Sequence, residues 1–169
     1  MKTLLLFITI LFSISVYSQS YKDTSLNVRI LRMDNYDSLK LQKHSKFIKE
    51  KFGYKVILPD NTIKSEDYLT ISNSFIDVIK LLQNMYCYEI TIIFTNNPLY
   101  ESPISLKGAT DYERKAIIID GNLDDINLVI IHEIGHVLGI HHCENTDCIM
   151  FDNAVKEEFC DKCSSFFKR

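Results

Sequence analysis

Residues 132–142 read HEIGHVLGIHH, which fits the pattern H-E-x-x-H-x-x-G-x-x-H. On an α-helix, residues four apart lie on the same face, so the spacing of His132 and His136 predicts two imidazoles that project side by side. Gly139 predicts the end of that helix, because glycine readily adopts the left-handed conformation that closes many helices. A turn at this glycine would bring a third imidazole, that of His142, back toward the first two.

Three neutral histidine nitrogens suit zinc, and they leave the fourth tetrahedral position open for water, as catalytic rather than structural zinc sites do. Glu133 follows the first histidine and is placed to accept a proton from water at such an ion. The five fixed positions match by chance in roughly one chain in 10⁵. The pattern therefore predicts hydrolysis at a zinc ion held by His132, His136 and His142. The neighbouring His141 is expected to face solvent or to contact a ligand side chain without binding the metal.

A run of cysteines and one methionine follows the histidines in the pattern H-C-x4-C-x-M, and then C-x-x-C. These residues are Cys143, Cys148, Met150, Cys160 and Cys163. The arrangement resembles the archaemetzincin family of zinc metallopeptidases, a branch of the metzincins, most closely over residues 131–150. One difference from the family pattern is the short stretch 151–159, which implies a tighter loop.

The resemblance implies a peptidase with two zinc ions per chain, one catalytic and one structural. The structural ion would be held by Cys143, Cys148, Cys160 and Cys163. The resemblance also implies that Met150 packs beneath the ligand histidines without binding the metal. The expected substrate is a peptide or protein. Whether the enzyme is an endopeptidase or an aminopeptidase stays open, since candidate acidic groups for an amine, such as Asp111 and Glu113, cannot be placed from sequence.

The four clustered cysteines allow two interpretations. Their spacing is typical of a structural zinc site, whereas an exported protein normally pairs its cysteines as disulfides. Bound zinc protects thiolates, and the family resemblance favours zinc over two disulfides. Cys87 lies apart from both pairs at the end of an apolar run, and it is predicted to be a buried, unreactive thiol.

Residues 1–18 have the features of a secretory signal peptide, with Lys2 at the start and a short apolar stretch over residues 4–16. This stretch is short for a membrane span. We therefore expect an exported protein, periplasmic or extracellular, without a stable membrane span after signal removal; a retained anchor is the alternative. Residues 19–169 would form one metallopeptidase domain.

The amino-acid composition limits the classes of molecule that the protein is expected to bind. The chain has 19 basic and 22 acidic residues and a formal net charge of −3. It has no basic patch with interleaved aromatic residues, so nucleic acid is not an expected partner, and a monomer is expected. Two alternatives to an active peptidase stay open: a secreted zinc-binding module of the same fold with weak or no activity, and a disulfide-linked interaction module. An intact Glu133 argues against the former, because a module that only binds has no need of a general base.

Apolar patterning predicts the element order βαβαββα. The predicted strands are 26–32, 54–58, 89–95 and 115–120, and the predicted helices are 36–51, 72–86 and 126–138. The fold class is α+β. The resemblance implies a single metzincin-like zincin domain with a mixed twisted sheet, two packing helices, a central metal-binding helix and a small C-terminal zinc-bearing subdomain.

Four local features complete the predicted fold. Asp124 or Asp125 is expected to cap the metal-binding helix. Residues 153–167 are expected to form a helix that carries the C-x-x-C pair toward the other two cysteines. The strand 115–120, or residues 108–112 before it, is expected to form a sheet edge to which a substrate adds as a strand. A helical stripe is expected in the core at Phe75, Ile76, Ile79, Leu82 and Met85.

Overall fold

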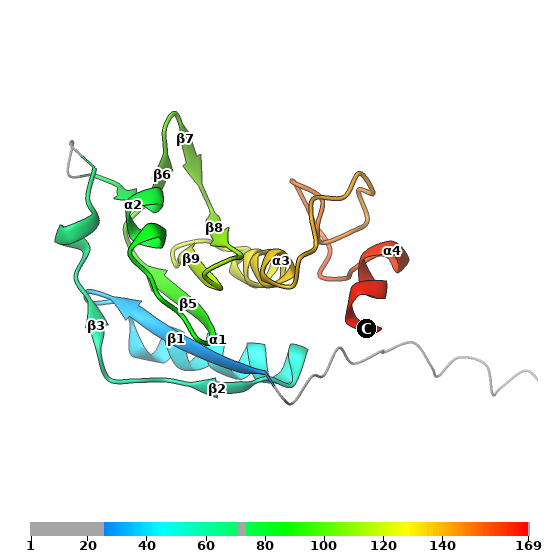
Figure 1. The fold of residues 1–169 in the computed structure, drawn as a ribbon, viewed down its shortest axis with the longest axis horizontal. Helices are drawn as coiled ribbons and strands as arrows, with labels where there is room; N and C mark the ends of the chain where they lie inside the picture. The colour runs from blue at the N-terminus through cyan, green and yellow to red at the C-terminus, as the bar shows by residue number, and fades with distance from the viewer. Residues whose placement is uncertain (1–25, 71–73, 169) are drawn as a thin grey trace, which may run out of the picture.

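A mostly parallel six-stranded sheet forms the framework of the computed structural model, which describes residues 26–70 and 74–168. The strand order is β2-β1-β5-β9-β8, and β3 pairs with β1 beyond the end of β2 (Figure 1). The strands are β1 (Asn27–Met33), β2 (Lys55–Ile57), β3 (Thr62–Ile63), β5 (Ile90–Thr95), β8 (Gly108–Asp111) and β9 (Ala116–Asp120). Only β8 runs antiparallel to its neighbour, β9, and it forms one edge of the sheet.

Helices cover both faces of this sheet. They are α1 (Ser38–Phe52), α2 (Val78–Gln83), α3 (Ile126–Val137) and the short α4 (Asp161–Ser164), with 3₁₀ turns η1 (Ser65–Tyr68) and η2 (Ser165–Lys168). Because side chains alternate along a strand, neighbouring residues of β5 serve different cores. Ile92 packs in the core that contains α1 and α3, whereas Ile93 packs in the core that contains α2. The predicted α+β class is therefore confirmed.

The predicted strands and helices before and after residues 72–86 correspond to β1, α1, β2, β5, β9 and α3, with bounds shifted by a few residues. The predicted helix at 72–86 is only partly right, and residues 71–73 lie outside the described residues. Ile76–Asp77 is a strand, β4, that pairs with β6 (Leu99–Glu101), which in turn pairs with β7 (Ile104–Leu106). The Asp77 carboxylate then accepts the backbone N–H of Lys80 at 3.0 Å and starts α2.

The expected apolar stripe of that segment is also partly wrong. Ile76 and Leu82 are buried, but Ile79 is 47% exposed because α2 turns it away from the sheet. Cys87 packs against the same core but is half-buried, so the prediction of a buried thiol overstated its burial.

The chain after α3 has little regular structure. Gly139 adopts a φ of 82°, in the left-handed region, so the helix ends where the sequence predicted. The segment that follows lies beside α3 and ends in α4 and η2, a shorter helical region than the predicted 153–167 (Figure 1). Among the residues that the structure describes, every helix is too short or too polar to cross a bilayer. The predicted signal segment, residues 1–18, lies outside them.

Candidate metal centre and active site

The three predicted ligand histidines meet at one point. The Nε2 atoms of His132 and His136 are 3.0 Å apart, those of His136 and His142 are 3.2 Å apart, and those of His132 and His142 are 3.3 Å apart. A tetrahedral zinc ion with zinc–nitrogen bonds of about 2.0–2.1 Å separates its ligand nitrogens by roughly 3.3 Å. The spacing of the three nitrogens therefore fits a zinc ion placed between them.

The opposite nitrogen of each ring has an acceptor that fixes its proton. The Nδ1 atoms lie 2.8 Å from the carbonyl oxygen of Ile149, 2.9 Å from that of Ile140 and 2.8 Å from Asp152 Oδ1, for His132, His136 and His142 respectively. A carbonyl or an ionised carboxylate only accepts, so each Nδ1 donates and each neutral ring presents an Nε2 lone pair. Three lone pairs that face one another repel unless a cation lies between them.

Burial keeps the two helical histidines neutral. It lowers the pKa of His132, and it lowers the pKa of His136 to about 4, with the neighbouring imidazoles adding to the effect. Neutral imidazole is the form that binds a metal. These two ligands are therefore ready to hold zinc at neutral pH without first releasing protons.

The helix that carries these histidines rests on Met150. Gly135 lies on α3 between the two ligands, and a Cβ atom there would collide with the Met150 Sδ atom. The absence of that Cβ atom lets the fully buried Met150 side chain pack directly against the helix. Met150 therefore lies against the helix that carries His132 and His136, and Gly135 is a requirement that the sequence pattern did not reveal.

Glu133 faces the edge strand β8. Its side chain is buried, and its Oε2 atom accepts a hydrogen bond of 2.7 Å from the Thr110 hydroxyl. Burial raises the pKa of Glu133 to about 7, although the hydrogen bond from Thr110 acts in the opposite direction. A Cβ atom on Gly108 would lie 2.9 Å from Glu133 Oε1, so the strand approaches the carboxylate closely. No sequence signal pointed to Thr110, because its partner lies on a different element.

Only one of the two predicted sheet edges is an edge. The strand 115–120 corresponds to β9, which pairs with β5 on one side and β8 on the other, so this alternative is wrong. Residues 108–112 contain β8, which has β9 as its neighbour and contacts α3. The exposed edge therefore lies next to Glu133.

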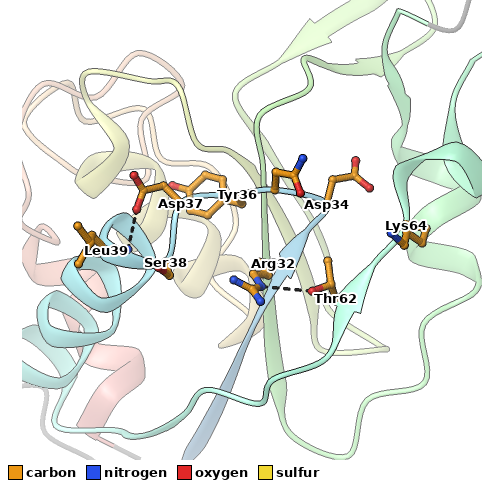
Figure 2. A pocket seen from close by; sticks show the side chains of 9 residues that line it. Arg32, Asp34, Tyr36, Asp37, Ser38, Leu39, Thr62 and Lys64 are labelled. Carbon is orange, nitrogen blue, oxygen red and sulfur yellow. Dashed lines mark hydrogen bonds between the residues drawn. The ribbon is translucent and has the colours of Figure 1, made fainter.

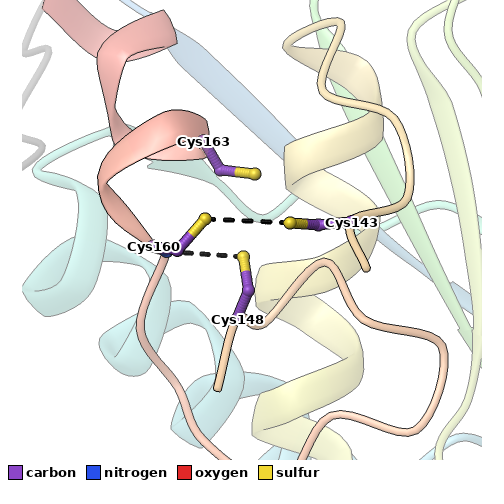
Figure 3. Close-up of side chains that lie close together, drawn as sticks. All are labelled: Cys143, Cys148, Cys160 and Cys163. Atoms are coloured by element: carbon purple, nitrogen blue, oxygen red, sulfur yellow. Dashed lines mark hydrogen bonds between the residues drawn. The ribbon is translucent and has the colours of Figure 1, made fainter. Parts of the chain in front are cut away.

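The four cysteines of the C-terminal segment also converge (Figure 3). Their Sγ atoms all lie within 4.8 Å of one another, and those of Cys143 and Cys160 are 3.7 Å apart. Tetrahedral zinc with bonds of about 2.3 Å separates its sulfur ligands by roughly 3.8 Å, whereas a disulfide requires about 2.05 Å. All four thiols are free. The arrangement fits a metal held by four thiolates better than two disulfides.

One thiol of this cluster is activated. Burial alone would raise the pKa of Cys160, but the backbone N–H of Cys163 and the neighbouring thiols lower it to about 7. The backbone N–H of Cys160 in turn lies 3.4 Å from Cys148 Sγ. Hydrogen bonds from backbone N–H groups to sulfur stabilise thiolates, which are the form that binds zinc; at Cys148, however, burial outweighs this bond and raises the pKa of the thiol.

Comparison with known proteins identifies the family of this chain. The family profile for Matrixin, a group of peptidases, matches residues 34–160. The chain is 23% identical to the archaemetzincin of Nanoarchaeum equitans over 146 residues, which is 79% of this chain and 86% of the relative. It is 27% identical to that of Saccharolobus solfataricus over 136 residues, which is 76% of this chain and 63% of the relative. The chain belongs to the archaemetzincin family of metzincin-like peptidases.

Solved archaemetzincins share the fold. The enzyme from Archaeoglobus fulgidus, complexed with malonate, has a TM-score of 0.72 at 20% identity and is matched over 83% of this chain and 99% of its own. The enzyme from Methanopyrus kandleri has a TM-score of 0.64 at 16% identity, over 91% of this chain and 98% of its own. The chain is thus a zinc metallopeptidase with an archaemetzincin fold, as the resemblance implied.

Two of the hollows on the described surface differ in whether predicted metal ligands line them. One of about 520 Å³ is bordered by His142 and by two of the clustered cysteines. The other, of about 610 Å³, lies where β1 leads into α1 (Figure 2). Here Arg32 Nε donates to Thr62 Oγ1 at 3.2 Å. Its lining contains none of the predicted site residues, so it has no part in the chemistry considered below.

Proposed function

We propose that this zinc metallopeptidase cleaves peptide bonds with Glu133 as the general base. The observation that carries the proposal is the convergence of three Nε2 lone pairs, two of them from a helix on which the adjacent Glu133 is buried beside a sheet edge. A purely structural metal site has no use for an adjacent buried carboxylate. The rival candidate, a zinc-binding module without activity, leaves Glu133 without a role.

A zinc ion held by His132, His136 and His142 would supply a Lewis acid that acidifies water and polarises the scissile carbonyl. The Glu133 carboxylate accepts the proton of the attacking water and later delivers it to the leaving amine. Thr110 holds Oε2 of this carboxylate, which leaves Oε1 for the proton. Because burial places the pKa of Glu133 at about 7, the group is able both to take and to return a proton near neutral pH.

The substrate adds to β8 as an extra strand. The edge strand offers unpaired backbone N–H and C=O groups along the side that faces away from β9. A peptide on this edge passes the carboxylate of Glu133, because Gly108 and Thr110 both contact that side chain. The same hydrogen bonds would hold any peptide sequence, so side-chain preference must come from elsewhere.

The structure bears on one of the two acidic residues considered for binding a substrate amine. An aminopeptidase needs an acidic group to hold the substrate amine, and Asp111 was one candidate. Its Oδ2 atom already accepts a 2.7 Å bond from Arg114 Nη1, and its Oδ1 atom accepts the backbone N–H of Arg114. A carboxylate that is already paired is a poor receptor for an ammonium group. Asp111 is therefore a poor candidate for holding a substrate amine, whereas Glu113 is exposed; both modes of cleavage stay open.

We also propose a second zinc ion in the four-cysteine cluster and export of the chain. The support for the second ion is the tetrahedral spacing of the sulfur atoms. The support for export is the signal-like composition of residues 1–18. Metal held by the cluster would keep the thiols reduced in an oxidising compartment, because bound thiolates are occupied.

The decisive experiment compares the wild type with Glu133→Gln. Peptide-library cleavage and elemental zinc content are measured on the same preparations. Turnover is expected to fall at least ~10²-fold, the usual scale for a general base, while the zinc content stays that of the wild type. A variant that cleaves peptides as fast as the wild type would refute the role of Glu133. An inert wild type that binds zinc would favour the binding module.

A further inference from the structure

The imidazole of His142 is held differently from the other two. His132 and His136 lie on α3, and their Nδ1 atoms donate to backbone carbonyl oxygens. His142 lies in the loop after Gly139 with a side chain that is 59% exposed, and its Nδ1 atom lies 2.8 Å from Asp152 Oδ1. The orientation of the third imidazole therefore depends on another side chain.

Backbone hydrogen bonds bring Asp152 to this position. The N–H of Cys143 donates to the carbonyl oxygen of Met150 at 2.8 Å, so the residues after His142 lie beside the residues before Asp152. The N–H of Phe151 donates to the carbonyl oxygen of Cys148 at 3.0 Å and turns the chain at that point. The carboxylate is therefore delivered to the imidazole by a defined turn, although both side chains are exposed.

We propose that Asp152 is a positioning residue for the third ligand. Its carboxylate accepts the Nδ1 proton of His142, selects the tautomer that presents the Nε2 lone pair, and holds the ring in the plane that faces the other two histidines. A carboxylate in this place also makes the ligand nitrogen more basic, which strengthens its bond to a metal. The inference rests on the proposed role of the three histidines as zinc ligands.

The same loop provides a matched control. Asp147 has a side-chain exposure of 68%, against 66% for Asp152, and its carboxylate forms an ion pair of 2.7 Å with Lys156. Removing either carboxylate makes the same change in net charge and exposes a similar surface. Of the two, only Asp152 contacts one of the three ligand histidines, so any difference between the two variants in the histidine-dependent metal binding reports on that contact.

The test measures zinc binding directly, by competition with a chromogenic chelator. It uses the full chain as wild type, Asp152→Ala, Asp152→Asn and Asp147→Ala, with His136→Ala to identify the histidine-dependent ion. Loss of a metal-supporting partner typically costs 10–100-fold in affinity. We expect about that loss in Asp152→Ala, a smaller one in Asp152→Asn, whose amide oxygen still accepts, and none in Asp147→Ala. Wild-type affinity in both Asp152 variants, or an equal loss in Asp147→Ala, overturns the inference.

Two further measurements separate positioning from mere loop stability. Thermal unfolding of the metal-free proteins is expected to be the same for Asp152→Asn and the wild type. The absorption of cobalt bound at the histidines is expected to change in Asp152→Asn, and excess zinc is expected to restore its peptide cleavage. Loss of metal-free stability with an unchanged cobalt spectrum would show a structural role only. If His136→Ala binds as much metal as the wild type, the proposed function itself fails.

Discussion

The sheet region, residues 27–120, and the loop region, residues 138–160, keep their shapes by different means. The sheet region is held by two apolar cores, in which Ile92 and Ile93 of the same strand face opposite ways. The loop region has no helix or strand. It is held by backbone turns and by apolar residues, such as Ile149, Met150 and Phe159, that pack onto the core containing α1 and α3. Its donor side chains gather at two points, the histidine centre and the cysteine cluster. Helix α3 joins the two regions, since it packs on the sheet and carries two of the ligands.

Under the proposed function, the histidine centre would carry out the chemistry and the cysteine cluster would stabilise the loop region. The histidine centre has three donors, so a tetrahedral zinc ion there would keep a fourth position for water, whereas the four donors of the cysteine cluster would fill all four positions. The two centres are joined by the same loop, because Cys143 directly follows His142. A metal in the closed centre would fix the loop that presents the third ligand of the open one.

The largest expected effect comes from opening the cysteine cluster. Cys148 is fully buried in it, and Cys148→Ser removes one thiolate from the proposed structural site. Because binding of a structural metal contributes folding free energy, several kcal/mol of stability should be lost. Thermal unfolding in the presence of zinc measures the loss.

Cys87→Ser is the matched control for that experiment, since Cys87 is a free, half-buried thiol outside the cluster. It should change stability by less than about 1 kcal/mol, as is usual away from special sites. Equal melting temperatures for Cys148→Ser and the wild type would show that the loop region does not depend on the cluster. Limited proteolysis would then be expected to spare residues 141–160 as well.

The second effect belongs to the sheet region and depends on pH. His44 of α1 is buried, and its Nε2 atom shares a hydrogen bond of 2.9 Å with the Tyr36 hydroxyl. Burial lowers the pKa of His44 to about 4, with nearby lysines adding to the shift. The unfolded chain therefore binds this proton first as the pH falls. The contribution of neutral His44 to the free energy of unfolding is fully present above about pH 6.5. It is lost as the pH falls toward 4, and the loss is on the order of 2–3 kcal/mol.

His44→Gln tests this directly, because glutamine has no charge to gain. The variant should be less stable than the wild type at pH 7, where the stacking on Phe94 is lost. The difference in unfolding free energy between the two proteins should shrink as the pH falls from 6.5 to 4. Denaturant unfolding of the metal-free proteins across this range measures it. A constant difference would mean that His44 is not the group that titrates.

These two regions also differ in how far the sequence predicted them. In the sheet region, long apolar patterns located β1, α1, β5, β9 and α3, but β3 and β4 are two residues long and have no pattern to read. The prediction of a helix over residues 72–86 was partly wrong because Asp77 caps α2, so the helix starts later than the apolar stripe suggested.

In the loop region and the adjoining α3, the convergence of the histidines and of the cysteines could be predicted because these residue types are rare and their spacing is local. Their supporting partners could not. The carbonyl oxygen of Ile149, the hydroxyl of Thr110 and the carboxylate of Asp152 reach the site only through the folded chain. In the sequence, Asp152 stands two positions after Met150, with no local pattern that links it to His142. Its contact with His142 depends on a turn that no local pattern encodes.

The third effect tests the contact between α3 and the loop region. Gly135→Ala places a Cβ atom against Met150 Sδ, and overpacking of a buried site typically costs 1–3 kcal/mol. The loss should appear in denaturant unfolding, together with weaker zinc retention by the adjacent histidines. Combining Gly135→Ala with Met150→Ala removes the collision, so the double variant should lose less than the sum of the single losses. Additive losses would place the collision elsewhere.

The smallest effect isolates the turn that joins the two regions. A Cβ atom at Gly139 would meet no other atom within 4 Å, yet the backbone there has a φ of 82°. Gly139→Ala should therefore cost about 1–2 kcal/mol through backbone conformation alone. Gly139→Asn should cost less, although its side chain is larger, because asparagine tolerates the left-handed region. A larger loss for asparagine than for alanine would mean that space, and not the backbone angle, requires glycine. Measuring zinc affinity alongside stability then shows how far the position of His142 depends on this one angle.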